Sequence, residues 1–372
     1  MSVVIGLMSG TSLDGVDGVL VRFDDTGAVE RLLGHRFIPF DAGLREALAE
    51  LQSPGDDELH RSALTANRLA TLYADVATHL IDAAGVDRGA VACIAAHGQT
   101  VRHRPELGFT VQLNNPALLA ERTGIAVVSD FRSRDVAAGG QGAPLVPAFH
   151  QSAFGREGQV RLIVNLGGIA NVTLLDGRTG ARGTVGYDIG PANVLMDAWV
   201  EQHLGEPFDR NGAWASIGQI DFALLEQMLA DPFFALSGPR STGRDHFNRD
   251  WLDEQLLVVP VAAPEDVQRT LLALTVELIA REAQSCERID AVVLCGGGAY
   301  NQTLLEALTE RLALCEPPPA IVTSQSLGIA PEQVEALAFA WLGWARLNDK
   351  AGNLPAVTGA RGPRVLGSLT PA

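Results

Sequence analysis

Lysine is almost absent from this sequence of 372 residues: Lys350 is the only one, so arginine supplies the rest of the 28 lysine and arginine residues. A Walker A loop needs a lysine on the terminal phosphates of its nucleotide, and a protein kinase needs a lysine on a strand. Lys350 lies in the polar stretch LNDKAGN and meets neither requirement. If the protein binds ATP, then glycine turns, hydroxyl groups, helix N-termini and a metal ion must hold the phosphates.

Cysteine is scarce as well. The four cysteines, Cys93, Cys286, Cys295 and Cys315, form no CxxC pair, which argues against a zinc site. Cys93 and Cys295 lie inside apolar runs that are typical of strands, so we expect buried free thiols. Free thiols fit a reducing compartment, and we therefore expect a cytoplasmic protein.

The sequence also lacks long apolar runs and an excess of positive charge. No run approaches the roughly 20 apolar residues of a membrane-spanning helix, and the stretch MSVVIGLMSGTS has no basic segment like that of a signal peptide. The net charge of −16 argues against nucleic acid as a partner. An anionic small molecule remains compatible with this charge, because backbone amides and a few arginines can bind phosphate in an acidic protein.

The order of the expected elements predicts an α/β protein with two domains. A strand, a glycine turn and a second strand open the chain at 3–23, and the same plan recurs at 161–177, which suggests a duplicated fold. The stretch 135–147 is rich in glycine and proline, so we place the domain boundary near residue 150. We assign 1–150 to an N-terminal lobe and 151–372 to a C-terminal lobe, whose glycine-rich tail packs along the surface or returns to the first lobe.

Apolar periodicity predicts the helices of both lobes. The expected helices cover residues 43–53, 60–84, 116–123, 192–204, 221–230, 263–285, 301–313 and 331–347.

Three glycine turns each follow an apolar strand and are candidate phosphate sites. The first, 9–17, adds hydroxyl groups and two carboxylates, Asp14 and Asp17, which could hold water on Mg²⁺; a plain hairpin is the alternative. The second, 165–171, has two glycines, for which a β-bulge is the alternative. The third, 295–301, has three glycines at a strand-to-helix junction, where a plain turn is the alternative. Each match is weak alone, but the set favours turns that line one ligand site.

Asp188 is a candidate general base. It follows the strand pattern GTVGYD and precedes a helix whose first turn contains Pro191, so its carboxylate would point away from the sheet edge. A carboxylate in that place could accept a proton from a sugar hydroxyl or from water. The alternative is that Asp188 caps the helix.

Polar side chains elsewhere suit a sugar or its carboxylate. His97, Gln99 and Thr100 lie at a strand end, followed by Arg102, His103 and Arg104, although a lone histidine is more often structural. Arg132 and Arg134 offer a cation for an anionic substrate, with a solvated loop as the alternative. The loop 240–245 combines arginine, hydroxyl groups and glycine, and Glu335 begins an otherwise apolar helix as either a dipole partner or a site residue.

Seven motifs, in this order, resemble the signatures of the anhydro-N-acetylmuramic acid kinases of bacteria. They are GLMSGTSLDGVD (6–17), HGQT (97–100), NLGGIAN (165–171), DIGPANVLMD (188–197), RSTGRDHFN (240–248), CGGGAYN (295–301) and GNLPAVTGA (352–360). The resemblance extends over essentially the whole chain.

The resemblance implies two duplicated ribonuclease-H-like lobes of the actin and hexokinase type around a central ATP cleft. It implies that ATP and Mg²⁺ bind, with two phosphate loops and an adenosine loop. The residues implied at ATP are Gly10, Thr11, Ser12, Leu13, Asp14, Gly15, Val16, Asp17, Asn165, Gly167, Gly168, Gly296, Gly297 and Gly298, with Asp14 and Asp17 as Mg²⁺ partners through water. The residues implied at the sugar are His97, Gln99, Thr100, Arg132, Arg134, Asn193 and Glu335.

Two places depart from the family pattern. Wider members of the superfamily have an aspartate early in the first phosphate loop, where this chain has Gly6 or Ser9. The usual sequence around the catalytic aspartate is DTGPGN, whereas this chain has DIGPAN, for which we expect a small adjustment of the helix start.

The activity implied is a coupled reaction on 1,6-anhydro-N-acetylmuramic acid in peptidoglycan recycling. Water attacks C1, the 1,6-ether opens, and O6 receives the γ-phosphoryl group of ATP, with Asp188 as the base for the water. Arg132 or Arg134 would bind the lactyl carboxylate, and a homodimer is expected. The alternatives are a kinase of another free amino sugar, a glycosidase that uses Asp188 with a second carboxylate, and an ATP-gated binding protein.

Overall fold

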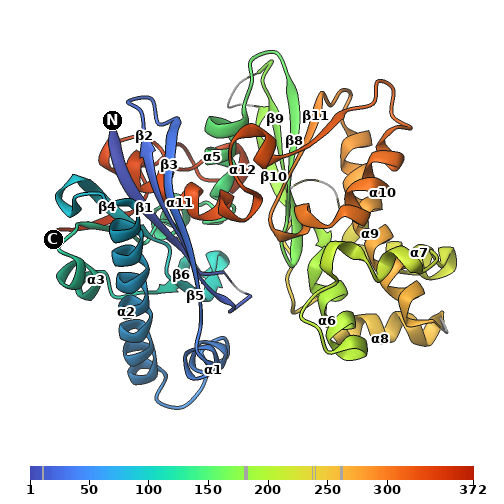
Figure 1. Ribbon diagram of the computed structural model, residues 1–372, viewed down its shortest axis with the longest axis horizontal. Helices are drawn as coiled ribbons and strands as arrows, with labels where there is room; N and C mark the ends of the chain where they lie inside the picture. Colours follow the sequence, from blue (N-terminus) through green and yellow to red (C-terminus); the bar gives the residue numbers. More distant parts are fainter. Residues whose placement is uncertain (11, 180–182, 237, 239, 260–262) are drawn as a thin grey trace. The chain divides into compact units, whose positions relative to one another are not determined.

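The computed structural model describes residues 1–372 except 11, 180–182, 237, 239 and 260–262 (Figure 1). The chain forms two compact units. One consists of Met1–Ala153 together with Gln333–Ala372, and the other of Phe154–Glu332. The residues after 332, which the sequence analysis assigned to the second lobe, are therefore grouped with the first unit.

The first unit is built on a six-stranded sheet with the order β13-β7-β4-β1-β2-β3. Strands β1, β2 and β3 form the antiparallel meander predicted for the start of the chain, and β4 and β7 continue from β1 in parallel. The bounds are β1 Ser2–Met8, β2 Gly15–Phe23, β3 Val29–Pro39, β4 Val91–Ala96, β7 Val127–Ser129 and β13 Ser368–Thr370, with a separate hairpin of β5 Gln99–Arg104 and β6 Phe109–Leu113.

The second unit repeats this plan. Its five-stranded sheet has the order β10-β9-β8-β11-β12, again a three-stranded antiparallel meander followed by two parallel strands. The bounds are β8 Val160–Leu166, β9 Ile169–Asp176, β10 Val185–Pro191, β11 Ala291–Cys295 and β12 Ala320–Thr323. The duplication predicted from the two similar openings is confirmed by this correspondence of strand order and direction.

The predicted helices begin and end within three residues of the observed ones. Gly85, for example, ends α2 in the left-handed conformation (φ 61°), as its position in the sequence predicted. In the first unit the helices are α1 Ala42–Glu50, α2 Glu58–Ala84, α3 Pro116–Thr123, α4 Ser133–Ala137, α5 Val146–Phe154 (all but its last residue), α11 Val334–Leu347 and α12 Pro355–Thr358. In the second they are α6 Asn193–Leu204, α7 Phe222–Leu229, α8 Arg249–Val258, α9 Pro264–Ser285 and α10 Gln302–Leu312.

Helix α11 joins the first unit because Gly6 leaves room for it. A Cβ atom added at Gly6 would lie 2.2 Å from the carbonyl oxygen of Ala336 and 2.8 Å from the Cβ atom of Ala340. The helix therefore packs directly on β1, β2 and β4 (Figure 1) and is buried along most of its length. Gly6 thus has a packing role in the first glycine motif.

The tail is held by one buried carboxylate. Asp135 is fully buried and accepts hydrogen bonds from Asn353 Nδ2 (2.6 Å), Thr358 Oγ1 (2.7 Å) and the Gly142 amide (2.8 Å). The Gln141 amide also donates to the Thr358 carbonyl oxygen (2.7 Å). These bonds make the segment around residues 353–358 part of the first unit, because a buried carboxylate must find such donors within the protein.

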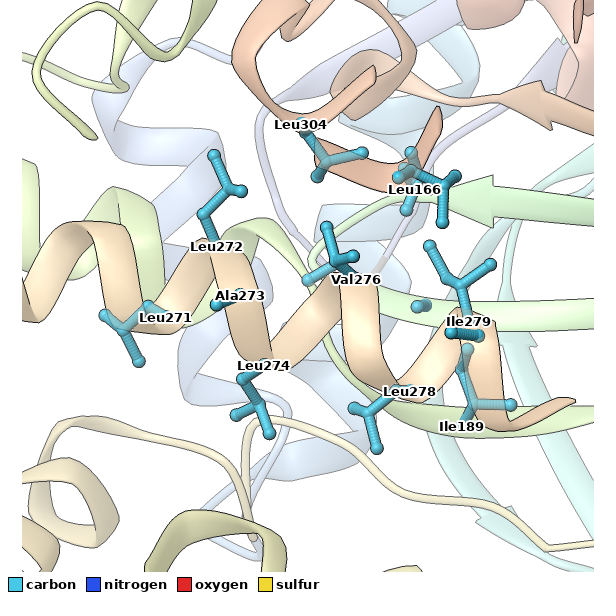
Figure 2. Close-up of a cluster of buried hydrophobic side chains, with 14 of the residues drawn as sticks. Leu166, Ile189, Leu271, Leu272, Ala273, Leu274, Val276, Leu278, Ile279 and Leu304 are labelled. Carbon is cyan, nitrogen blue, oxygen red and sulfur yellow. The ribbon is translucent and has the colours of Figure 1, made fainter. Parts of the chain in front are cut away.

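Helix α9 forms the centre of the second unit. Figure 2 shows apolar side chains on several sides of this helix, together with Leu166 of β8, Ile189 of β10 and Leu304 of α10. A helix that is apolar on more than one face is covered by neighbours on each of them. The side chains of α9 in this cluster include Leu271, Leu272, Ala273, Leu274, Val276, Leu278 and Ile279.

The predicted thiol state agrees with the structure: the four cysteines are free, and Cys93 and Cys295 are buried. Within the described part of the chain, no helix combines the length and apolar character needed to cross a membrane.

Replacing Gly6 by alanine should destabilise the protein, because the added Cβ atom meets the backbone of α11. We expect a loss of about 2–3 kcal/mol, measured from urea unfolding. Gly10→Ala is the matched control from the same motif, since its Cβ atom would lie no closer than 3.6 Å to the atoms around it. Equal unfolding midpoints for the two variants would contradict the packing role of Gly6.

Candidate functional site

Asp188 lies within β10 and is held by the loop that contains Ser241 and Thr242. Its Oδ2 atom accepts hydrogen bonds from Ser241 Oγ (2.9 Å) and from the Thr242 amide (3.0 Å). Its own amide donates to the Arg240 carbonyl oxygen (3.0 Å). Two donors on one oxygen orient the carboxylate, while Oδ1 has no hydrogen-bond partner among the described residues.

The alternative of a helix cap at Asp188 is wrong. Strand β10 continues to Pro191, and α6 begins only at Asn193, after Ala192, which makes no side-chain cap. Pro191 is therefore the last residue of the strand, not a residue of the first helical turn as predicted. Beyond a register shift between Asp188 and Gly190, β10 continues to pair with β9 as far as Pro191 opposite Ile169, which local sequence patterns do not reveal.

The surroundings of Asp188 favour proton acceptance. Burial raises the pKa of its carboxyl group above the ordinary value, whereas the hydrogen bonds from Thr242 and Ser241 and the charge of Arg240 act in the opposite direction. A carboxylate with a raised pKa is a stronger base than an exposed aspartate, yet the donors keep the ionised form accessible. The geometry and the charge environment therefore suit a general base.

The first glycine turn is a hairpin joined to the HGQT motif. The Gly10 carbonyl oxygen accepts from the Leu13 amide (3.3 Å) and from Gln99 Nε2 (3.0 Å). Ser9 is buried, and its hydroxyl group donates to the Gly98 carbonyl oxygen (3.1 Å). Thr11, expected at ATP, lies outside the described residues.

The remaining residues of this turn divide into packing and exposed positions. A Cβ atom at Gly15 would lie 2.4 Å from the Ile38 carbonyl oxygen, and Val16 is fully buried, so both belong to the sheet. Asp14 is exposed, and its Oδ1 atom accepts from Ser12 Oγ (2.8 Å) and the Gly15 amide (2.9 Å). Asp17 lies in β2, 3.0 Å from His35 Nε2.

Among the described residues, no group of three or more metal-ligating side chains occurs. Mg²⁺ at a nucleotide usually takes only one or two carboxylates and completes its shell with water and phosphate oxygens. The exposed carboxylate of Asp14 fits this requirement better than Asp17, which already contacts a histidine.

The second glycine turn connects β8 and β9 without a bulge, so that alternative is wrong. Its carbonyl oxygens instead accept from the start of α6: the Asn193 amide donates to Gly167 (3.1 Å) and the Ala192 amide to Gly168 (2.9 Å). Asn193 Nδ2 donates in addition to the Leu166 carbonyl oxygen (2.9 Å). Hydrogen bonds therefore join the second glycine turn to the start of α6, and we call these two segments together the corner.

The third glycine turn packs against this corner. A Cβ atom at Gly296 would lie 2.4 Å from Asn165 Oδ1, and one at Gly298 would lie 2.7 Å from the Leu166 Cβ atom. A Cβ atom at Gly297 would meet no atom within 4 Å. Two of the three glycines are thus required for close packing, and the middle one adjoins open space.

The start of α6 and the third glycine turn border a pocket of about 430 Å³ in the second unit. Of the residues predicted for the site, Asn193, Gly297 and Gly298 line it. Sequence reasoning assigned no ligand role to Asp197, although it stands four residues after Asn193 on α6 and therefore on the same helix face. Tyr300 and Asn301, which also line the pocket, belong to the predicted turn 295–301, whereas Met196, 208–211 and Gln268 were missed.

The pocket contains an unusual carboxyl group. Burial raises the pKa of Asp197 to about 7; nearby Arg244 opposes this effect and Asp209 adds to it. A group that changes charge near neutral pH inside a pocket is a candidate ligand contact.

In the first unit, His97 and Glu335 are associated with Arg132. His97 is buried; its Nδ1 atom donates to the Ser9 carbonyl oxygen (3.3 Å), and its Nε2 atom accepts from Arg132 Nε (3.2 Å) and Nη2 (3.0 Å). Arg132 Nη1 donates to the Gly142 carbonyl oxygen (2.8 Å). Burial lowers the pKa of Arg132 to about 10, against the opposing charge of Glu335. The His97 imidazole therefore holds the Arg132 guanidinium in position.

Other predicted sugar residues lie in the same unit. Gln99 is buried, and its Oε1 atom has no partner among the described residues. Thr100 Oγ1 accepts from Gln112 Nε2 (3.1 Å). Arg134 is exposed on α4, and Arg102 bonds to Glu58 (2.7 Å), an ion pair within the unit.

A family model described as "Anhydro-N-acetylmuramic acid kinase" matches residues 2–372. A protein of that name from Burkholderia orbicola (strain MC0-3) is 52% identical over 370 residues, which cover 99% of this chain and 96% of the relative. The one from Burkholderia thailandensis is 53% identical over 379 residues, covering 99% and 97%.

The fold is similar to that of a solved structure. The crystal structure of component A of (R)-2-hydroxyglutaryl-CoA dehydratase from Acidaminococcus fermentans matches with a TM-score of 0.50 and 12% identity, covering 92% of this chain and 97% of that one. Together with the repeated sheet plan, this confirms the predicted α/β fold of two duplicated lobes.

His97 should remain neutral well below pH 6.5, because burial and the charge of Arg132 lower the pKa of its imidazole. Its contribution to stability is then present above the unfolded pKa of about 6.5 and is lost as the pH falls toward the folded pKa. We expect its NMR ring signals, assigned with His97→Gln, not to titrate between about pH 8 and pH 5. A midpoint near the ordinary value would contradict the proposed neutral acceptor.

Proposed function

The chain belongs to the anhydro-N-acetylmuramic acid kinase family, and on that basis we propose that it phosphorylates 1,6-anhydro-N-acetylmuramic acid with ATP. The reaction opens the anhydro ring with water and produces N-acetylmuramic acid 6-phosphate and ADP. Its place is peptidoglycan recycling and amino-sugar metabolism. The observation that carries the proposal in the structure is the oriented Asp188 carboxylate, whose pKa is raised by burial.

Asp188 is the base in this proposal. Its carboxylate accepts a proton from water while the water oxygen forms a bond to C1, and the C1–O6 bond breaks. The O6 atom then forms a bond to the γ-phosphorus, the bond from that phosphorus to the bridging oxygen breaks, and ADP leaves. Oδ1, which has no partner among the described residues, is the oxygen available for the proton.

The glycine turns replace a lysine as phosphate ligands. The backbone amides at Gly10 and at Gly167 and Gly168 are the proposed phosphate contacts, and the open space at Gly297 accommodates the nucleoside. When bound, Mg²⁺ neutralises phosphate charge, and Asp14 is the carboxylate we propose to hold its water. Asn193 lines the same pocket as Gly297, so we reassign it from the sugar to the nucleotide.

Arg132 is preferred to Arg134 for the lactyl carboxylate of the sugar. Its guanidinium is oriented by His97 and Gly142 and lies near the charge of Glu335, whereas Arg134 is exposed. A guanidinium held in place loses little side-chain entropy when it binds a carboxylate. His97 is then a supporting residue for Arg132 and does not need to contact the sugar.

None of the four cysteines forms a disulfide, which supports a cytoplasmic location. The expected homodimer stays a prediction that light scattering of the purified protein can test.

The activity is tested by incubating the protein with ATP, Mg²⁺ and the anhydro sugar in ¹⁸O-labelled water. We expect N-acetylmuramic acid 6-phosphate with the label on C1, because water supplies that oxygen. An unlabelled phosphorylated product indicates simple phosphorylation, and ring opening without ATP indicates a glycosidase; either result overturns the proposal.

Asp188→Asn should lower kcat by about three orders of magnitude, because the amide cannot accept the proton. Nucleotide affinity, measured by calorimetry, should stay within about twofold, since the residue does not line the nucleotide pocket. Asp176→Asn, at the end of the neighbouring strand β9, is the control. Near-normal turnover of Asp188→Asn would remove this residue as the base.

A further inference from the structure

Beside Asp188, a buried ion pair connects the loop that holds it to helix α9. Arg240 Nη2 donates to Glu282 Oε1 (2.6 Å), and the Tyr187 hydroxyl group donates to Glu282 Oε2 (2.6 Å). The side chains of Arg240 and Glu282 are only 11% and 12% exposed. Both carboxylate oxygens therefore have a donor, as a desolvated carboxylate requires.

The Arg240 side chain has further contacts. Its Nη1 atom donates to the Leu236 carbonyl oxygen (2.9 Å). The guanidinium carbon lies 4.9 Å from the centre of the Tyr187 ring and 5.7 Å from that of Phe233. Cation–π contacts of this kind gain strength when water is excluded. The side chain is therefore held in one position by an ion pair, a hydrogen bond and two rings.

Arg240 and the two residues that follow it form hydrogen bonds with Asp188. The Arg240 carbonyl oxygen accepts from the Asp188 amide, and the next two residues, Ser241 and Thr242, donate to the Asp188 carboxylate. Tyr187 precedes Asp188 on β10. A movement of Arg240 would therefore move both donors relative to the carboxylate.

We propose that the cluster of Arg240, Glu282 and Tyr187 positions the catalytic base. These are positioning residues, since they act through the loop and not on the substrate. The inference rests on the proposed role of Asp188 and goes beyond it by naming what sets the orientation and the charge environment of that residue.

Charge provides a second effect of the same cluster. Among the described residues that act on the Asp188 carboxyl group, Arg240 carries a positive charge and opposes the rise in pKa caused by burial. Ser241 and Thr242 contribute hydrogen bonds. Loss of the guanidinium should therefore raise the pKa of Asp188 further and leave less of the base ionised at neutral pH.

The test compares two glutamates of α9. Glu282→Gln removes the charge that anchors Arg240, whereas Glu277→Gln removes a more exposed pair with Arg311 (2.6 and 3.1 Å) that forms no hydrogen bond with the described residues of the loop. We expect kcat of Glu282→Gln to fall on the order of 10- to 100-fold, with KM for ATP within about twofold. The control should retain kcat within about twofold. Equal values of kcat for the two variants would overturn the proposal.

The pH profile of kcat separates positioning from a general loss of structure. Asp188 must be ionised to act as a base, so the acid limb should move to higher pH in Arg240→Gln. Arg240→Lys keeps the charge and should leave the limb in place while lowering kcat, because a lysine does not reproduce the fork geometry. An unmoved limb in Arg240→Gln contradicts the proposal.

Should Glu282→Gln fail to fold, Tyr187→Phe remains informative. It removes one donor from Glu282 but keeps the ion pair, and we expect kcat to fall on the order of threefold, as for one hydrogen bond. An unchanged kcat would overturn the proposal. Asp188→Asn, run alongside, separates the two hypotheses: an inactive Asp188→Asn with a fully active Glu282→Gln rejects only the positioning role.

Discussion

In each unit, glycines allow two segments of the chain to approach more closely than residues with a Cβ atom would permit. The packing of the neighbouring helices and strands depends on these close approaches. In the first unit, Gly6 faces the Ala336 carbonyl oxygen, so α11 lies directly on β1. In the second, Gly296 and Gly298 lie against the end of β8, and Gly298 also lines the pocket. Several glycines of the motifs are therefore required for packing, and positions such as Gly297 are left beside open space for a ligand.

The described groups that act on the Asp188 carboxylate in the second unit include no lysine. Asp188 is partly buried, which disfavours its charge, and the opposing influences come from an amide, a hydroxyl group and the guanidinium of Arg240. A guanidinium can hold two partners at once in fixed directions, which a lysine cannot. In the first unit Arg132 is held in a similar way by His97 and Gly142. Arginines with oriented side chains thus occur at both proposed centres.

Much of the fold could be predicted from local patterns. Apolar periodicity and glycine turns identified the two meanders, their duplication and the helices, because these depend on residues close together in the sequence. The alternative reading of Asp188 as a helix cap failed because the register between β9 and β10 depends on pairing across the sheet. For the same reason the support of Arg132 by His97 was not foreseen: the two residues are 35 positions apart and meet only in the folded unit.

By itself, the sequence determined the family, the two-lobed α/β plan and the candidate base, since motifs and periodicity express local chemistry. Tertiary structure decided which unit receives residues 333–372, which glycines are needed for packing, and that Asn193 adjoins Gly297 in a pocket. It also decided that Glu282, 94 positions from Asp188, belongs to the surroundings of the base through Arg240. The physical reason is that burial, close packing and ion pairing depend on distances in space, which separation along the chain does not specify.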